Sequence, residues 1–314
     1  MHLKKNTLGN TGIEVTELCF GVLPMGPLQL GVDVKYGAQV IREAVEAGVD
    51  FLDTAQGYRT YEHIRLALDG FKGQVHIASK SQAASYETME AAVRQALQEL
   101  RLDSVDVFLL HAARSGPEVF DERAGALACL RDQRSKGLVR SVGISTHSVT
   151  AMRRAVDTPD IDVLFPIINR AGLGILHGAR DEMAEEIARA ARLGKGVYAM
   201  KSLGGGNLIS DVEGSLAYVR GLPGVSSVAV GMVALPELRM NLDIFEGRPV
   251  RERVPGHVKN LFIQSLCEGC GTCVKACPNG ALSLVNGKAT VDKARCIMCG
   301  YCAPECPEFA IRLV

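Results

Sequence analysis

Ten cysteines lie in this chain of 314 residues, and eight of them fall between residues 267 and 306. These eight repeat one pattern twice, C-x2-C-x2-C-x3-C, and each run ends in a proline, Pro278 or Pro307. Thiolates at this close spacing bind soft metal centres, either inorganic iron–sulfur clusters or zinc. A structural zinc site normally uses two C-x2-C pairs, without a third cysteine in step and without the trailing proline. The spacing therefore favours iron–sulfur clusters and a chain that handles single electrons.

The repeated run resembles bacterial ferredoxins that carry two [4Fe-4S] clusters, and the resemblance covers residues 259–314. In that family three cysteines of a run bind one cluster, while the fourth ligates the other. The resemblance implies that cluster 1 is bound by Cys267, Cys270, Cys273 and Cys306. It implies that cluster 2 is bound by Cys296, Cys299, Cys302 and Cys277. The remaining cysteines, Cys19 and Cys129, are expected to be small buried residues in a strand and a helix.

Composition and charge narrow the class of protein. Apolar residues make up 47% of the chain and charged residues 22%, which is typical of a soluble globular protein. Lys+Arg and Asp+Glu are both 35, so nothing favours a nucleic-acid or membrane-surface partner. Residues 1–12 lack the apolar stretch of a signal peptide, so we expect a reducing, cytoplasmic setting and not a secreted disulfide scaffold. Prolines and glycines interrupt the longest apolar stretch, residues 18–32, which predicts no membrane span.

Short apolar runs alternate with amphipathic segments over residues 1–245, as expected for strands that helices cover on both faces. The predicted strands are Leu18–Val22, Val49–Asp53, Val75–Ser79, Val105–His111, Val139–Ser145, Val163–Ile167, Val197–Lys201 and Val225–Val230. Helical patterns lie between them, for example at Thr88–Leu100 and Met183–Leu193. This alternation predicts an α/β fold, a closed (β/α)8 TIM barrel. The competing doubly wound sheet usually carries G-x-G-x-x-G after its first strand, and the chain has no such motif there.

The chain divides into three predicted parts. Residues 1–245 form the barrel, and the charged, proline-containing residues 246–258 form a polar linker. Residues 259–314 form a small α+β ferredoxin-like domain whose two halves repeat each other. Between the halves, Ala281–Val285 and Lys288–Val291 flank Asn286-Gly287 and predict a β-hairpin.

Four polar residues end or follow neighbouring predicted strands, where a barrel of this kind places its chemistry. They are Asp53, Tyr58, Lys80 and His111. Each alone has a structural explanation, such as a helix cap or a solvated side chain, but the four together predict a site. We expect the Lys80 ammonium to lower the pKa of Tyr58, and Asp53 to hold Lys80 in place. With His111 orienting a carbonyl oxygen, the group would protonate that oxygen while hydride reaches the carbon.

The segments that contain these residues resemble the aldo-keto reductase family. The matching motifs are Phe51–Tyr58 with Glu62 after it, Ile77–Lys80, Asp106–His111, Val142–Ser145, Leu8–Gly12 and Met200–Gly206. The resemblance spans residues 1–245. It implies a catalytic tetrad of the four polar residues, with Tyr58 as the general acid/base, and a small carbonyl or alcohol substrate.

The same resemblance implies a nicotinamide cofactor, NADP(H) or NAD(H), that lies extended across the barrel mouth. Ser145 and Asn169 would lie near its carboxamide, and Met200 stands where an aromatic residue often stacks on the ring. Asn241 would contact the adenine. The other implied cofactor contacts are Lys201 and, near the phosphates, Gly204, Gly205, Gly206 and Asn207.

Departures from the family pattern concern this cofactor site. Thr146 stands where the family usually has asparagine, and Phe165 stands where it usually has glutamine. Residues 232–234 replace the basic residues that commonly bind an adenosine 2′-phosphate, and Met240 replaces an acid. The acid–base residues are thus kept, while the contacts to NADP differ.

Nicotinamide passes two electrons as hydride, whereas an iron–sulfur cluster passes one at a time, so three interpretations stay open. In the first, the chain is a nicotinamide-dependent carbonyl reductase or alcohol dehydrogenase whose clusters carry electrons, dock a redox partner protein or sense redox state. In the second, a flavin or a redox-active substrate at the barrel mouth divides electron pairs between the two halves. In the third, the barrel is a scaffold and the chain is an electron-transfer protein, which the intact tetrad argues against.

Overall fold

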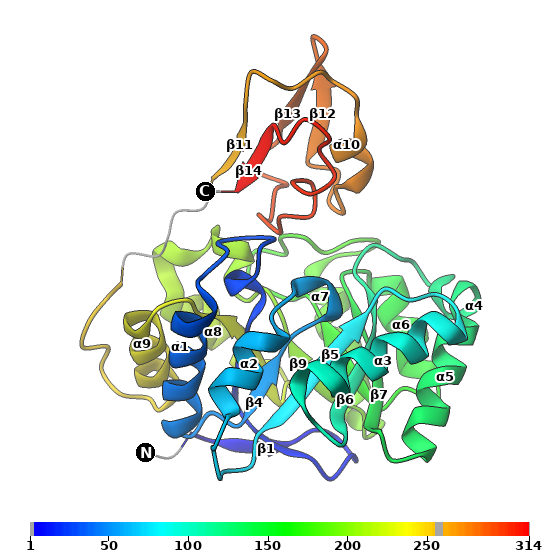
Figure 1. Ribbon diagram of the computed structural model, residues 1–314, viewed down its shortest axis with the longest axis vertical. Helices are drawn as coiled ribbons and strands as arrows, with labels where there is room; N and C mark the ends of the chain where they lie inside the picture. The colour runs from blue at the N-terminus through cyan, green and yellow to red at the C-terminus, as the bar shows by residue number, and fades with distance from the viewer. Residues whose placement is uncertain (1–2, 255–259, 314) are drawn as a thin grey trace.

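The computed structural model describes residues 3–254 and 260–313. Eight parallel strands close into a barrel, which confirms the predicted TIM-barrel fold (Figure 1). In barrel order the strands are β10 (Ser227–Gly231), β3 (Leu18–Gly21), β4 (Phe51–Asp53), β5 (His76–Ser81), β6 (Val105–Ala112), β7 (Val139–Thr146), β8 (Val163–Pro166) and β9 (Gly196–Ala199). All residues of β3, β4, β5, β8 and β9 are buried, which explains the short apolar runs in most of these strands.

Helices cover the outside of the barrel (Figure 1). The helices after η1 (Leu23–Met25) are α1 (Val34–Glu46), η2 (Gln56–Tyr58), α2 (Tyr61–Leu68), α3 (Tyr86–Leu100), α4 (Val119–Glu122), α5 (Ala124–Ser135), α6 (Val149–Asp157), α7 (Arg180–Arg192), η3 (Gly204–Gly206), η4 (Ile209–Asp211), α8 (Val212–Arg220) and α9 (Leu235–Phe245). The helical patterns at Thr88–Leu100 and Met183–Leu193 correspond to α3 and α7. Helix α3 begins with a capping box, in which the Ser85 side chain accepts a hydrogen bond from the Thr88 amide and Thr88 bonds back.

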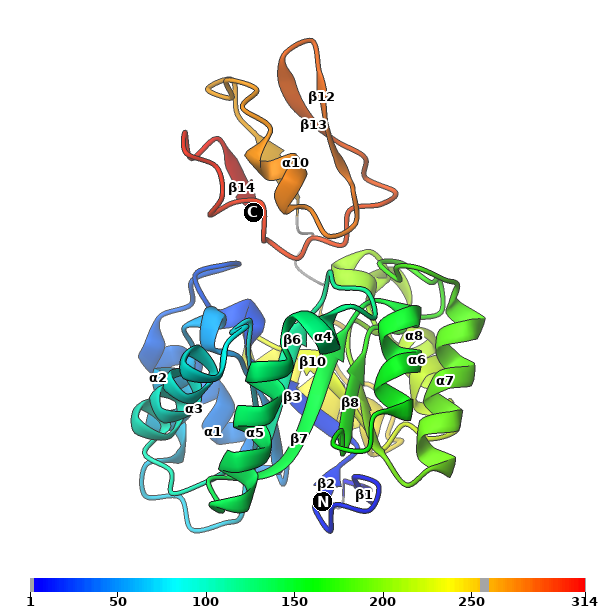
Figure 2. The same cartoon turned by 90° about the vertical axis from the view of Figure 1, so that its right-hand side faces the viewer.

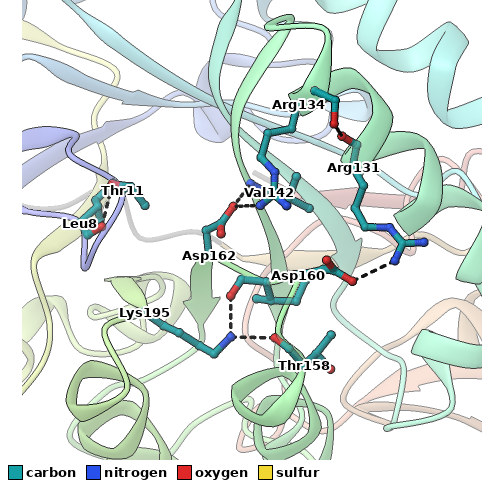
Figure 3. A network of polar contacts seen from close by, with 11 residues as sticks. Leu8, Thr11, Arg131, Arg134, Val142, Thr158, Asp160, Asp162 and Lys195 are labelled. Carbon is teal, nitrogen blue, oxygen red and sulfur yellow. Dashed lines mark hydrogen bonds and ion pairs between the residues drawn. The ribbon is translucent and has the colours of Figure 1, made fainter.

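The end of the barrel away from the strands' carboxyl termini is closed by local contacts (Figures 2 and 3). The hairpin of β1 (Lys5–Thr7) and β2 (Glu14–Thr16) lies there, and the sequence patterns missed it. Asp162 accepts hydrogen bonds from Arg134 at 2.7 Å and from the Val142 amide at 2.9 Å. These contacts join α5 and β7 to the residue before β8, far from the predicted chemistry, so their role is to stabilise the barrel.

A small module sits above the carboxyl ends of the barrel strands in both views (Figures 1 and 2). It contains β11 (Leu261–Ile263), α10 (Thr272–Ala276), β12 (Leu282–Val285), β13 (Lys288–Val291) and β14 (Ile311–Leu313). Strands β12 and β13 pair antiparallel, which confirms the predicted hairpin, and β11 pairs with β14. The predicted linker, 246–258, precedes the module, and its residues 255–258, with 259, lie outside the described residues.

The module contacts the barrel through the segment from Cys296 to Tyr301. The Asn207 amide donates to the Cys296 carbonyl at 3.0 Å, and Ile297 and Cys299 pack into the hydrophobic core of the barrel. Gly205 lies so close to the module that an added Cβ would approach the Ile297 carbonyl oxygen to 1.9 Å. The two parts therefore share one packed interface. No helix within the described ranges is long and apolar enough to cross a membrane.

Candidate active site

The four predicted catalytic residues come together at the carboxyl end of the barrel. Asp53 ends β4, Tyr58 lies in η2, Lys80 lies in β5, and His111 lies in β6. All four are buried, and Lys80 has no exposed surface. The rings of Tyr58 and His111 meet edge to face, with centroids 5.8 Å apart. Two hydrogen-bonding groups that could face one substrate oxygen therefore lie side by side.

Lys80 is fully engaged by its neighbours. Its ammonium donates to both carboxylate oxygens of Asp53 at 2.8 Å and to the Thr54 carbonyl at 2.7 Å. These bonds use all three donors of the ammonium. The charge therefore lies over the face of the Tyr58 ring, 4.8 Å from its centroid, and has no proton left to donate to the phenol oxygen.

This arrangement corrects one prediction. Burial holds the pKa of Tyr58 well above its ordinary value of 10, followed by the electrostatic effects of Tyr301 and Asp53. The prediction that the pKa of Tyr58 is lowered is wrong, because desolvation of the phenolate outweighs the neighbouring positive charge. Tyr58 is therefore protonated at neutral pH, which is the state that a general acid requires.

His111 is neutral at the same site. Burial, and next the charge of Lys80, hold its pKa well below the ordinary 6.5. Its Nε2 atom lies 3.3 Å from the hydroxyl of Tyr301, which belongs to the small module. His111 can therefore share a hydrogen bond with an uncharged oxygen without adding a second positive charge beside Lys80.

A groove extends from the tetrad across the barrel mouth, with an empty volume of about 1190 Å³ that includes its open side. Asp53 and Tyr58 are among the residues that line it. Five of the predicted cofactor contacts line it, namely Met200, Lys201, Gly205, Gly206 and Asn241. A groove of this size accommodates an extended dinucleotide.

Two buried polar atoms fit such a cofactor. The Ser145 hydroxyl, on β7 beside His111, and the Asn241 carbonyl oxygen have no hydrogen-bond partner among the described residues. A nicotinamide carboxamide and an adenine amino group would supply the missing partners at these two positions. Asn169 differs, because both ends of its amide already bond to the Leu173 backbone.

The predicted phosphate contacts have a second role. Gly204 is buried beside Leu173 and Leu208, and Gly205 packs on the Ile297 carbonyl. Asn207 donates to the Gly204 carbonyl and to the Cys296 carbonyl. This loop thus supports the small module as well as lining the groove.

The cysteines form two groups that follow the crossed assignment. Cys277 shares a cavity with Cys296, Cys299 and Cys302, and the empty volume of this cavity is about 330 Å³. Burial, and next the neighbouring thiols of that group, raise the pKa of Cys302 to about 12. In the other group, burial raises the pKa of Cys273, and the thiols beside it are Cys267, Cys270 and Cys306.

These groups fit iron–sulfur clusters better than single ions. Backbone amides donate to the sulfurs of Cys267, Cys277 and Cys306 at 3.2 to 3.3 Å, as suits electron-rich sulfur. Within the described part of the chain, no three candidate ligands converge on a point where one metal ion could sit. A zinc ion needs its thiolates at about 2.3 Å, whereas a cubane spreads them over a larger body. Cys19 and Cys129 are buried in β3 and α5, as predicted.

Two family profiles match separate parts of this chain. The profile of the Aldo/keto reductase family matches residues 17–217. The chain belongs to this family. A 4Fe-4S dicluster domain matches residues 259–307, so this aldo/keto reductase is fused to a ferredoxin module.

Individual relatives are distant from this aldo/keto reductase. It is 21% identical to the uncharacterized oxidoreductase YqkF of Bacillus subtilis over 80% of this chain and 94% of that protein. It is 25% identical to the methylglyoxal reductase DkgA of Escherichia coli over 56% of this chain and 68% of that protein. The holo form of the aldo-keto reductase AKR11C1 from Bacillus halodurans superposes with a TM-score of 0.64, at 20% identity, over 79% of this chain and 92% of that one. That superposition supports the barrel fold alone.

Sequence reasoning about this aldo/keto reductase missed two tyrosines. Tyr198 on β9 donates to Asp53 at 3.0 Å, and its ring stacks on Phe165 at 3.9 Å between centroids. Tyr301 comes from the other part of the chain. Neither stood in a recognisable motif, since Tyr198 lies in an apolar run and Tyr301 lies between two cluster ligands.

Proposed function

We propose that this aldo/keto reductase is an iron–sulfur oxidoreductase that reduces a small carbonyl compound with a nicotinamide cofactor, and that its clusters carry electrons. The observation that supports this most strongly is the buried Asp53–Lys80 pair under the ring of Tyr58, at the end of the groove. A scaffold would have no use for a fully desolvated ion pair at that place, because such a pair costs free energy to bury.

The residues divide the work as follows. Tyr58 donates its phenolic proton to the carbonyl oxygen, and neutral His111 orients that oxygen by a hydrogen bond. Lys80 stabilises the phenolate that remains, because its charge lies 4.8 Å from the ring centroid. A bound nicotinamide would supply the hydride to the carbonyl carbon. Ser145 and Asn241 would hold that cofactor in the groove.

The raised pKa of Tyr58 keeps the phenol in the protonated state that carbonyl reduction requires. Oxidation of an alcohol would need Tyr58 as a base, and its pKa, held well above 10 by burial, leaves it protonated at neutral pH. Relatives named methylglyoxal reductase make a small aldehyde such as methylglyoxal the first substrate to test.

The experiment uses protein purified without oxygen, with both clusters in place. Binding of NADPH and NADH is measured by the change in nicotinamide fluorescence, and turnover by nicotinamide oxidation that depends on methylglyoxal. We expect one nicotinamide to bind and to be oxidised, and Asn241→Ala to weaken its binding about tenfold, as loss of a buried hydrogen bond would. Failure of both nicotinamides to bind would contradict the proposal.

The second candidate function is electron transfer, in which the barrel is a scaffold or holds a flavin. The contact of Tyr301 with His111 favours it, because the small module covers the substrate side of the tetrad. Flavin absorption bands in the purified protein, together with no nicotinamide binding, would support this alternative.

A further inference from the structure

The segment between two cluster 2 ligands enters the barrel mouth. Ile297 packs on Gly205 from one side, and Gly300 approaches the loop after η1 from the other. At Gly300 the backbone has φ of +85°, and an added Cβ would come within 2.3 Å of the Leu28 carbonyl oxygen. Only glycine fits this close approach, so the segment is wedged between two loops of the barrel.

Tyr301 is the residue that this segment delivers to the tetrad. Its hydroxyl lies 3.3 Å from Nε2 of His111, and the Tyr58 side chain is close enough for the two tyrosines to affect each other's pKa. The guanidinium of Arg114 lies over the Tyr301 ring, 5.4 Å from its centroid, and the ring meets that of His111 edge to face at 6.5 Å between centroids. The Tyr301 ring therefore lies against the tetrad.

The Tyr301 hydroxyl lies where the carbonyl oxygen of a substrate would have to bind. A carbonyl oxygen that accepts a proton from Tyr58 and a hydrogen bond from His111 must lie between them, within about 3 Å of each. The Tyr301 hydroxyl is itself an oxygen with hydrogen-bonding capacity, and it already bonds to His111 and lies close to Tyr58. A second oxygen cannot occupy the same position.

We propose that the Cys299–Cys302 segment forms the substrate-side wall of the catalytic site, and that the Tyr301 hydroxyl occupies the position of the substrate's carbonyl oxygen until substrate displaces it. The inference rests on the proposed function, since it assigns the competing oxygen to a carbonyl substrate. Tyr301 is thus a residue of the ferredoxin module that decides which carbonyl compounds gain access to Tyr58.

The proposed wall limits the exposure of His111 to solvent. With Tyr301 in contact with its Nε2 atom, only 6% of His111 is exposed. Removing the Tyr301 ring should open a path from solvent to that nitrogen. Removing only the hydroxyl should leave the path closed but vacate the position of the oxygen.

The test compares Tyr301→Ala and Tyr301→Phe with wild type in cluster-loaded protein. Diethyl pyrocarbonate labels accessible neutral histidines, and peptide mass spectrometry gives the labelling rate of each one. Tyr36→Ala is the matched control, because Tyr36 is 42% exposed on α1 and does not contact the tetrad. Buried His63 serves as an internal reference in every sample.

We expect His111 to be labelled at least tenfold faster in Tyr301→Ala, with His63 unchanged and with the cluster absorption of wild type. Tyr301→Phe should keep the wild-type labelling rate and lower the KM for methylglyoxal several-fold. Equal His111 labelling in Tyr301→Ala and Tyr36→Ala would overturn the proposal. If Tyr301→Ala loses its clusters, an unchanged or raised KM in Tyr301→Phe would overturn it equally.

The labelling needs no turnover, so it separates this inference from the proposed function. If His111 is labelled fast in Tyr301→Ala but wild type reduces no carbonyl, the substrate-side wall is supported and the proposed carbonyl reduction is contradicted. If wild type reduces the carbonyl but His111 labelling is unchanged in Tyr301→Ala, the proposed carbonyl reduction is supported and the substrate-side wall is contradicted.

Discussion

Lys80 shows how far the chemistry of this site depends on one buried charge. It has no exposed surface, and its three donors are bonded to Asp53 and Thr54. The sequence correctly predicted Lys80 beside Tyr58, but it did not predict the net direction in which the pKa of the phenol moves. That direction depends on the balance between desolvation and charge, and a motif does not contain this balance.

Removing the charge should therefore affect stability as well as turnover. In Lys80→Met the Asp53 carboxylate stays buried without its partner, and we expect the free energy of unfolding to fall by about 3–5 kcal/mol. Anaerobic urea unfolding of wild type and variant measures this. The double variant with Asp53→Asn should recover most of the loss, and no recovery would show that the pair is not the cause.

The pH dependence of reduction should follow from Tyr58 and His111. Reduction needs protonated Tyr58, and burial holds its pKa well above 10, so activity is present below that pKa and is lost as pH rises through it. His111, with its pKa held far below 6.5, stays neutral from mildly acidic pH upward. We expect kcat/KM for carbonyl reduction to be flat between about pH 7 and 9. A loss of activity as pH rises through that window would contradict the assignment of Tyr58, and a loss as pH falls through it would contradict that of His111.

Glu237 should influence the choice between the two nicotinamides. It lines the groove one helical turn from Asn241, at the end predicted to hold the adenine. A carboxylate there repels an adenosine 2′-phosphate, whereas it tolerates a ribose hydroxyl. We expect Glu237→Gln to tighten NADPH binding several-fold and to leave NADH binding within twofold, as measured by fluorescence titration. Equal changes for both cofactors would exclude this charge effect.

At the scale of elements, the barrel strands could be predicted from the sequence because most are short, largely apolar and buried on both faces. The hairpin of β1 and β2 could not be predicted, since its strands have only three residues each, KNT and EVT, and contain no apolar run. For the loop of η3, the sequence predicted only contacts with the phosphates of a cofactor. Its packing on Ile297 depends on a residue more than ninety positions away, which local patterns cannot reveal.

Two neighbouring glycines in η3 give a matched test of the interface between the barrel and the module. Both have positive φ, but an added Cβ meets the Ile297 carbonyl at 1.9 Å from Gly205 and meets nothing within 4 Å from Gly206. Gly205→Ala should therefore loosen the module, while Gly206→Ala pays only the backbone strain. Limited proteolysis of residues 246–254 should be clearly faster in Gly205→Ala. Equal cleavage of the two variants would show that this contact does not hold the module.

At the scale of the molecule, the barrel site and the cysteine-rich module meet at one interface. The cysteine spacing predicted the module and the strand pattern predicted the barrel, but nothing in either pattern predicted that the module would cover the tetrad. That contact joins residues 111 and 301, and it follows from packing between parts that each fold around their own core. A chain whose cluster ligands flank a residue of the acid–base site is expected to use the two parts together.

The most direct test of this account is the Tyr58→Phe variant, measured for carbonyl reduction and for visible cluster absorption on the same anaerobic sample. The Tyr36→Phe variant serves as the control. We expect kcat/KM for the carbonyl to fall by about 10²–10⁴, the contribution of a positioned general acid, with the cluster spectrum unchanged. Turnover by Tyr58→Phe at the wild-type rate would contradict the account, because the barrel site would then not be the place where the proton is transferred.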